Sequence, residues 1–221
     1  MSLAFSMHEL LSDRGPVQAT VEHFADAFPA SISADLATVV RTMPDGNVAP
    51  SSKRWSYVLD GQVLRVPVRQ YFPEPAAEIV RRYTPSQLAV ASALYCSHHD
   101  GFVRQRAFRI LVTTRAPWVP ALTLRLLGEY VVPIHSDVLH HAKSGDLAQA
   151  MFATFASENE ALLETTIQRI ISYLDAYGWA WTRADRDLSV VSARDALVEL
   201  GLWRPSVARG LMKRAERWPS L

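Results

Sequence analysis

The sequence predicts a mainly α-helical protein that carries one β-hairpin, at about residues 54–71, near the end of its first third. Two observations lead to this fold class. β-Prone runs flank an Asp-Gly pair in that segment, and from residue 76 onward apolar residues recur at helical spacing behind helix-start signals. Hydrophobic residues make up 49% of the 221 and charged residues 20%, which is typical of an ordered globular protein. We expect N-terminal helices plus the hairpin over 1–75 and a helical region over 76–221, joined as one structural unit.

Residues 3–43 are predicted to be helical. The segment "PVQATVEHFADAF" has apolar residues spaced by four, three and four, and Pro16 suits the first turn of such a helix. "SADLATVVRTM" repeats the pattern, with Ser33 as its expected N-cap. "MPDGNVAPSSK" is rich in Pro, Gly, Asn and Ser and is predicted to be a loop. The apolar positions of the two helices are Val17, Val21, Phe24 and Phe28, then Leu36, Val39, Val40 and Met43.

The segment "RWSYVLDGQVLRVPVRQYF" predicts a hairpin. Asp60-Gly61 is a favoured pair for the positive φ angles of a type I′ turn. The residues before it alternate between the apolar Trp55, Tyr57 and Leu59 and more polar neighbours, as in a half-buried strand. Pro67 has no N–H group, so its strand should lie at an edge or form no ladder bond there. A lone hairpin is marginal in water, so it must pack on the helices or on a partner.

Three start signals organise the helical region. "TPSQ" at 84–87 is a capping box with proline at the first helical position, "SENE" at 157–160 is a second box, and "SARD" at 192–195 is a weaker third start. The helix after "SENE" should end at Gly178, the one after "SARD" at Gly201, and a last helix should follow from Pro205. The apolar stripe expected after "SENE" consists of Leu163, Ile167, Ile170, Leu174 and Tyr177.

The stretch "HHDGFVRQRAFRIL" at 98–111 has a recognisable spacing of Asp100, Val103-Arg104, Ala107 and Leu111. It resembles the second helix of a HEAT-like α-helical repeat, specifically over residues 84–111 and loosely to residue 177. The resemblance implies a HEAT-like or irregular α-α solenoid of helical pairs, in which an aspartate caps the helix and the arginine binds an acidic group or carbonyl of the next repeat. The following unit departs from the pattern, because Pro133 stands where the repeat has its arginine.

Two histidine-rich segments are candidate metal or catalytic sites. His98, His99 and Asp100 form one, and "HSDVLHH" places Asp137 and His141 four residues apart with His140 beside them. Zinc accepts His and Asp ligands, so a composite of His98, His99, Asp137, His140 and His141 is the sharpest enzyme hypothesis. The competing interpretation is that the first group is a helix end and turn and the second a solvated surface. Cys96 lies inside a predicted helix, where cysteines are usually inert.

Basic side chains provide candidate binding residues. Arg104 belongs to the repeat-like helix, while Arg209, Lys213 and Arg217 are spaced by four near Trp203 and could meet phosphates or an acidic protein. Lys plus Arg total 23 against 22 Asp plus Glu, so nucleic acid is disfavoured by the near-neutral balance. No run is long and apolar enough for a membrane span, and the N-terminus lacks the features of a secretory signal. With a single cysteine, a cytoplasmic protein is expected.

These observations favour a non-enzymatic protein that binds a protein partner through a stacked-helix surface and needs no cofactor. Bacterial adaptor or toxin-neutralising roles would fit, by analogy alone. The first alternative is a nucleic-acid-binding protein of the HEAT-like DNA-repair glycosylase type. The second is the metal-dependent enzyme built on the five His and Asp residues above.

Overall fold

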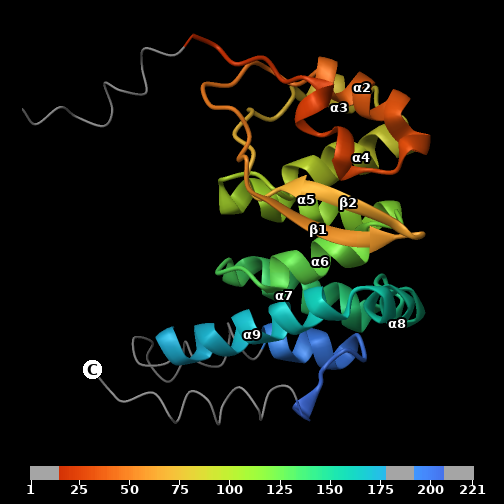
Figure 1. Ribbon diagram of the computed structural model, residues 1–221, viewed down its shortest axis with the longest axis vertical. Coiled ribbons are helices and arrows are strands. Elements are labelled where there is room, and N and C mark those ends of the chain that lie inside the picture. Colours follow the sequence, from red (N-terminus) through yellow and green to blue (C-terminus); the bar gives the residue numbers. More distant parts are fainter. Residues whose placement is uncertain (1–14, 178–191, 207–221) are drawn as a thin grey trace, which may run out of the picture.

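The structure is a computed structural model that describes residues 15–177 and 192–206. Its helices lie across a long axis, and the chain descends that axis largely in sequence order, with the hairpin running across the middle of the view between the levels of α4 and α6 (Figure 1). The fold is mainly helical with one two-stranded antiparallel sheet, as predicted. The helices are α2 (Ser33–Arg41), α3 (Ala77–Val80), α4 (Pro85–Tyr95), α5 (Gly101–Thr114), α6 (Val119–Leu127), α7 (Val132–Ser144), α8 (Gln149–Glu158) and α9 (Glu160–Tyr177), and the strands are β1 (Arg54–Leu59) and β2 (Gln62–Pro67).

The prediction of a first helix over residues 16–28 is wrong. Residues 16–28 form no α-helix but two short 3₁₀ turns, Val21–His23 and Ala25–Ala27. The Thr20 amide donates to the His23 ring, and the His23 amide donates to the Thr20 carbonyl, so a tight turn begins in the middle of the segment. Phe24 and Phe28 are nevertheless buried. The apolar spacing therefore identified core residues correctly but not the backbone conformation of the segment. Residues 3–14 of that prediction lie outside the described part.

The second predicted helix is confirmed as α2, whose expected apolar stripe is buried. Its N-cap is Ile32 rather than Ser33, because a further 3₁₀ turn at Ala30–Ile32 leads directly into it. The loop predicted after it is also present.

The hairpin is confirmed in detail. Asp60 and Gly61 both have positive φ angles, 49° and 73°, and Leu59 pairs with Gln62 across a two-residue loop. Tyr57 and Leu59 are buried, whereas Arg54 and Ser56 are exposed, so one face packs on the protein. With only two strands, both are edges, and Pro67 closes the pairing opposite Arg54 without breaking an internal ladder.

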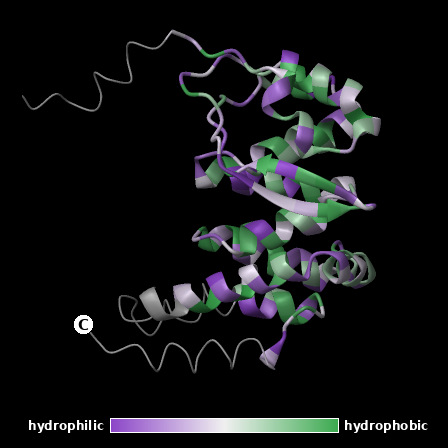
Figure 2. Ribbon diagram, viewed as in Figure 1, coloured by the Kyte–Doolittle hydropathy of each residue, from purple (hydrophilic) through white to green (hydrophobic). Residues whose placement is uncertain are grey.

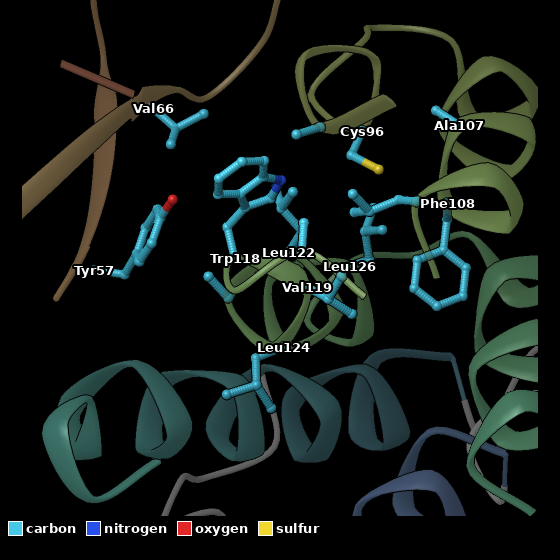
Figure 3. Packing of buried hydrophobic residues seen from close by; sticks show 14 of the residues in the cluster. Tyr57, Val66, Cys96, Ala107, Phe108, Trp118, Val119, Leu122, Leu124 and Leu126 are labelled. Carbon is cyan, nitrogen blue, oxygen red and sulfur yellow. The ribbon is translucent and has the colours of Figure 1, made fainter. Parts of the chain in front are cut away.

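The helix α6 is the centre of the packing. All nine of its residues are buried, and it contacts α5, α7, α8 and α9. Trp118 directly precedes α6, and Figure 3 shows its ring beside Leu122 and facing Tyr57 and Val66 of the hairpin. Leu124 points the other way, toward the helix drawn below α6. A helix surrounded on every side accounts for its nearly continuous apolar sequence.

Helices α8 and α9 correct the second capping-box prediction. Ser157 does not begin a helix: it lies in the last turn of α8, where its hydroxyl donates to the Thr154 carbonyl. The chain bends at Asn159, and α9 begins at Glu160. The Asn159 side chain accepts from the Val58 amide at 2.7 Å and donates to the Val58 and Phe155 carbonyls, each at 2.9 Å. It therefore occupies the outer edge of β1.

One hydrophobic cluster extends from Ala19 to Leu202, and Figure 2 shows hydrophobic residues in every layer of the stack. In α9 the expected residues Leu163, Ile167 and Ile170 are buried. Residues 192–199 form a further helix, after which Gly201 has the positive φ expected of a helix stop. Gly178, most of the predicted last helix and the side chains of Leu174 and Tyr177 lie outside the description. Among the described residues, no helix has the length and apolar character needed to cross a membrane.

Candidate functional site

Asp100 and Arg104 form the junction between α4 and α5. Asp100 caps α5, since its side chain accepts a hydrogen bond from the Phe102 amide at 2.7 Å. One turn into the helix, Arg104 is only 5% exposed and its Nη1 donates to the carbonyls of His98 and His99 at 2.7 and 2.8 Å. These bonds hold the end of α4 against the start of α5, as expected of an inter-helix turn.

Glu129, in the turn between α6 and α7, is the acidic partner of three arginines. Its Oε1 lies 2.8 Å from Arg69 Nη1 and 2.9 Å from Arg125 Nη1. Its Oε2 lies 2.9 Å from Arg104 Nε, but the two atoms lack hydrogen-bond alignment. The carboxylate is 5% exposed, so segments from the hairpin exit, α5 and the end of α6 meet at one buried charge.

This cluster is not electrically balanced. Three guanidinium groups share a single carboxylate, and an unpaired buried charge is costly. Burial lowers the pKa of Arg104 and of Arg125, while Glu129 acts in the opposite direction on both. Arginine nevertheless stays protonated at neutral pH because its intrinsic pKa is so high. The cluster thus retains a positive excess that calls for an anion.

The excess charge borders a pocket of about 420 Å³. Arg169 of α9 joins the three clustered arginines in its wall, and no ion pair connects Arg169 to an acidic side chain within the described residues. Glu129 is the one acidic residue among the described lining residues, so four arginines and one glutamate leave a formal charge of +3. Tyr130 and Tyr173 supply aromatic wall beside them.

Two glycines allow the elements around the pocket to approach closely. A Cβ atom at Gly128 would lie 3.2 Å from Arg169 Cδ, and one at Gly101 would lie 3.2 Å from a methyl group of Val131. The Tyr173 hydroxyl donates to the Gly128 carbonyl at 3.1 Å, which ties α9 to the end of α6. The pocket is therefore bordered by packed helix ends and not by long loops.

The five candidate metal ligands do not converge. Within the described residues, no group of three or more His, Cys, Asp or Glu side chains is arranged to hold a metal ion. Asp137 receives two hydrogen bonds from Arg109, at 2.8 and 2.9 Å, and a third from Gln105. The rings of His98 and His99 are tilted by 43° with their centres 4.3 Å apart, and His140 contacts His141. The composite site is therefore not assembled.

His141, Ser144 and Asp146 are a separate cluster at the end of α7. His141 Nδ1 and Ser144 Oγ both bind the same Asp146 oxygen, at 2.9 and 2.7 Å. In a nucleophilic triad the serine would bond to the histidine instead. These hydrogen bonds, together with Gly145 at a positive φ of 83°, stabilise the C-terminal end of α7.

His98 should make stability depend on pH. Burial, followed by neighbouring His99, lowers its pKa to about 4 against the weaker opposing effects of Asp100 and Glu74. The native state prefers the neutral ring, so its contribution is complete above the unfolded-state pKa of about 6.5 and is lost as pH falls toward about 4. We expect the loss of unfolding free energy between about pH 7 and about pH 5 to be smaller in His98→Asn than in the wild type, by urea denaturation.

The comparison between the two proteins removes the background from other carboxylates. In the structure the Asp100 amide donates a hydrogen bond to His98 Nδ1 at 3.1 Å. The side-chain oxygen of asparagine can accept the same bond. Parallel pH profiles for the two proteins would contradict the assignment.

The remaining sequence candidates are placed only in part. Arg209, Lys213 and Arg217 lie outside the described residues. Trp203 is half-buried, and the Arg194 guanidinium lies 5.8 Å from the centre of its ring. Cys96 is fully buried, and burial raises the pKa of its thiol, which opposes a nucleophilic role.

Sequence reasoning found Arg104 but missed its partners. Arg125 and Glu129 are four residues apart, a spacing that favours an ion pair, and this was the available signal. Arg69 and Arg169 carried no comparable signal, because they reach the pocket from the hairpin exit and from α9. The chain matches no protein-family model, and no curated protein or solved structure matches it.

Proposed function

We propose that this protein is a binding protein whose arginine pocket, lined by Arg69, Arg104, Arg125 and Arg169, receives a phosphate or similar oxyanion of its ligand. The observation that carries the proposal is the charge of the pocket: four arginines face one glutamate among its described lining residues. Guanidinium groups bind phosphate oxygens through pairs of parallel hydrogen bonds, which makes arginine the preferred residue for this recognition.

The geometry leaves donors available for such an anion. Arg69 and Arg125 each contact Glu129 through Nη1, and Arg169 forms no ion pair with a described acidic residue. An anion placed between them would offset charge that Glu129 alone does not balance. Partial burial strengthens the interaction, because screening by water and salt is weaker than at an open surface.

This function agrees in class with the interaction protein expected from the sequence, but it replaces a broad surface with a defined site. The proposal includes a HEAT-like arrangement of the helices. Two contacts support it: Asp100 caps α5, and Arg104 lies 2.9 Å from the acidic Glu129 in the following inter-helix turn. Binding to a protein partner is the use to which a surface of stacked helices is commonly put, and an acidic group of that partner would suit the same pocket.

Thermal unfolding in inorganic phosphate tests the pocket. Phosphate at about 100 times its Kd should raise the free energy of unfolding by about 2.7 kcal/mol, and sodium chloride at equal ionic strength should not. Arg169→Gln should abolish most of the increase, because Arg169 belongs to the pocket without being part of the buried cluster. Arg81→Gln, the same charge change at a side chain that is 68% exposed, should leave the increase intact. Equal effects of phosphate and chloride would rule out the pocket as an anion site.

A further inference from the structure

The pocket is larger than an isolated oxyanion requires. Its volume of about 420 Å³ lies in the range of sites for small organic molecules, which is about 300–1,000 Å³. The arginines occupy part of the wall, and two tyrosines occupy another part. The pocket therefore has room for a second, non-anionic portion of a ligand beside the two tyrosines.

Tyr130 is an exposed aromatic residue held in a fixed position. Its ring centre lies 3.5 Å from that of Tyr173, and the Tyr173 hydroxyl is anchored on the Gly128 carbonyl. Tyr130 is nevertheless 54% exposed, in a turn directly after Glu129. Aromatic rings beside a cationic groove provide a stacking surface on which the bases of nucleic acids bind.

We infer that the ligand is a nucleotide whose phosphate lies among the arginines and whose base stacks on Tyr130. The inference rests on the proposed anion pocket and adds the ligand class. A terminal phosphate monoester suits the site better than a phosphodiester within a strand, because its second negative charge offsets more of the +3 excess. The chain as a whole has a net charge of only +1, which favours a single nucleotide over a long backbone.

Calorimetric titration of the full chain with four small probes separates the parts of this inference. Adenosine 5′-monophosphate should bind about 5- to 150-fold more tightly than ribose 5-phosphate, which carries the phosphate without the base. Adenosine, which lacks the phosphate, and inorganic phosphate should both be weaker than the monophosphate. A 5′-phosphorylated oligonucleotide and its unphosphorylated form test whether the ligand is a free nucleotide or the end of a strand. We expect the mononucleotide to bind as tightly as the phosphorylated strand.

Variants of the tyrosine provide the readout that charge alone would not change. Tyr130→Ala should bring the monophosphate down to the affinity of ribose 5-phosphate, whereas Tyr130→Phe should keep the difference. Phe102→Ala, at an aromatic residue that is 68% exposed and outside the pocket lining, serves as the control and should change neither affinity.

The failures of the two proposals are distinguishable. Equal affinity for the monophosphate and ribose 5-phosphate would overturn the nucleotide assignment and leave the anion pocket standing. A phosphotyrosine peptide that binds more tightly than the monophosphate would overturn it in favour of a protein ligand. Binding of neither ribose 5-phosphate nor the monophosphate would overturn both proposals, as would binding that Arg169→Gln does not weaken.

Discussion

Replacing Glu129 with glutamine is expected to lower the free energy of unfolding by about 3–5 kcal/mol, the usual cost of removing one partner from a buried ion pair. Glutamine has nearly the same shape, so the loss reflects charge more than packing. Arg69, Arg104 and Arg125 would be left together without their shared carboxylate. Urea denaturation of the two proteins measures the difference.

A second measurement on the same variant links stability to binding. Phosphate should stabilise Glu129→Gln more than the wild type, because the anion then replaces the missing carboxylate as well as occupying the pocket. Glu78→Gln removes a carboxylate whose partner Arg81 is 3.0 Å away at the surface, and should cost no more than about 1 kcal/mol. A similarly small loss for Glu129→Gln would show that the arginines do not depend on it.

Replacing Asn159 with alanine is expected to cost about 2–4 kcal/mol, because it removes three hydrogen bonds and leaves the polar groups of the Val58 backbone without their partner. Asn159 itself is buried, so water cannot replace those bonds without entering the packing. Hydrogen exchange at the Val58 amide should accelerate by more than the overall loss of stability explains.

Two further variants at this bend give the prediction its controls. Asn159→Asp keeps an oxygen that accepts from the Val58 amide but cannot donate to the two carbonyls, so it should be at least as destabilising as alanine. Thr165→Ala, on the exposed side of α9, should change stability by no more than about 0.5 kcal/mol. If Asn159→Ala lowers the free energy of unfolding as little as Thr165→Ala does, the hairpin is held on the protein by the packing of its apolar face alone.

Local signals explain most of what the sequence predicted. Asp60 and Gly61 determine the hairpin turn by themselves, and Thr84 with Gln87 closes its capping box within four residues. The spacing around Asp100 and Arg104 also predicted a real junction. Each of these features depends on neighbours in the chain, so a single sequence contains the required information.

The errors have equally specific causes. Apolar residues between Val17 and Phe28 fit a helical period, but Thr20 and His23 favour a tight turn that periodicity does not detect. "SENE" has the letters of a capping box, yet Asn159 leaves the helix to bind a strand 101 residues earlier. The arginine pocket was missed as a unit because Glu129 and Arg69 are 60 residues apart. Such contacts are determined by tertiary packing.

The position of Asn159 on β1 also constrains the order of folding. The hairpin can form early from local interactions, but the edge of its first strand is completed only by a residue 101 positions later. Closing so long a loop is slow compared with forming the adjacent helices. During synthesis the outer edge of β1 therefore stays without this partner until Asn159, between α8 and α9, has emerged from the ribosome.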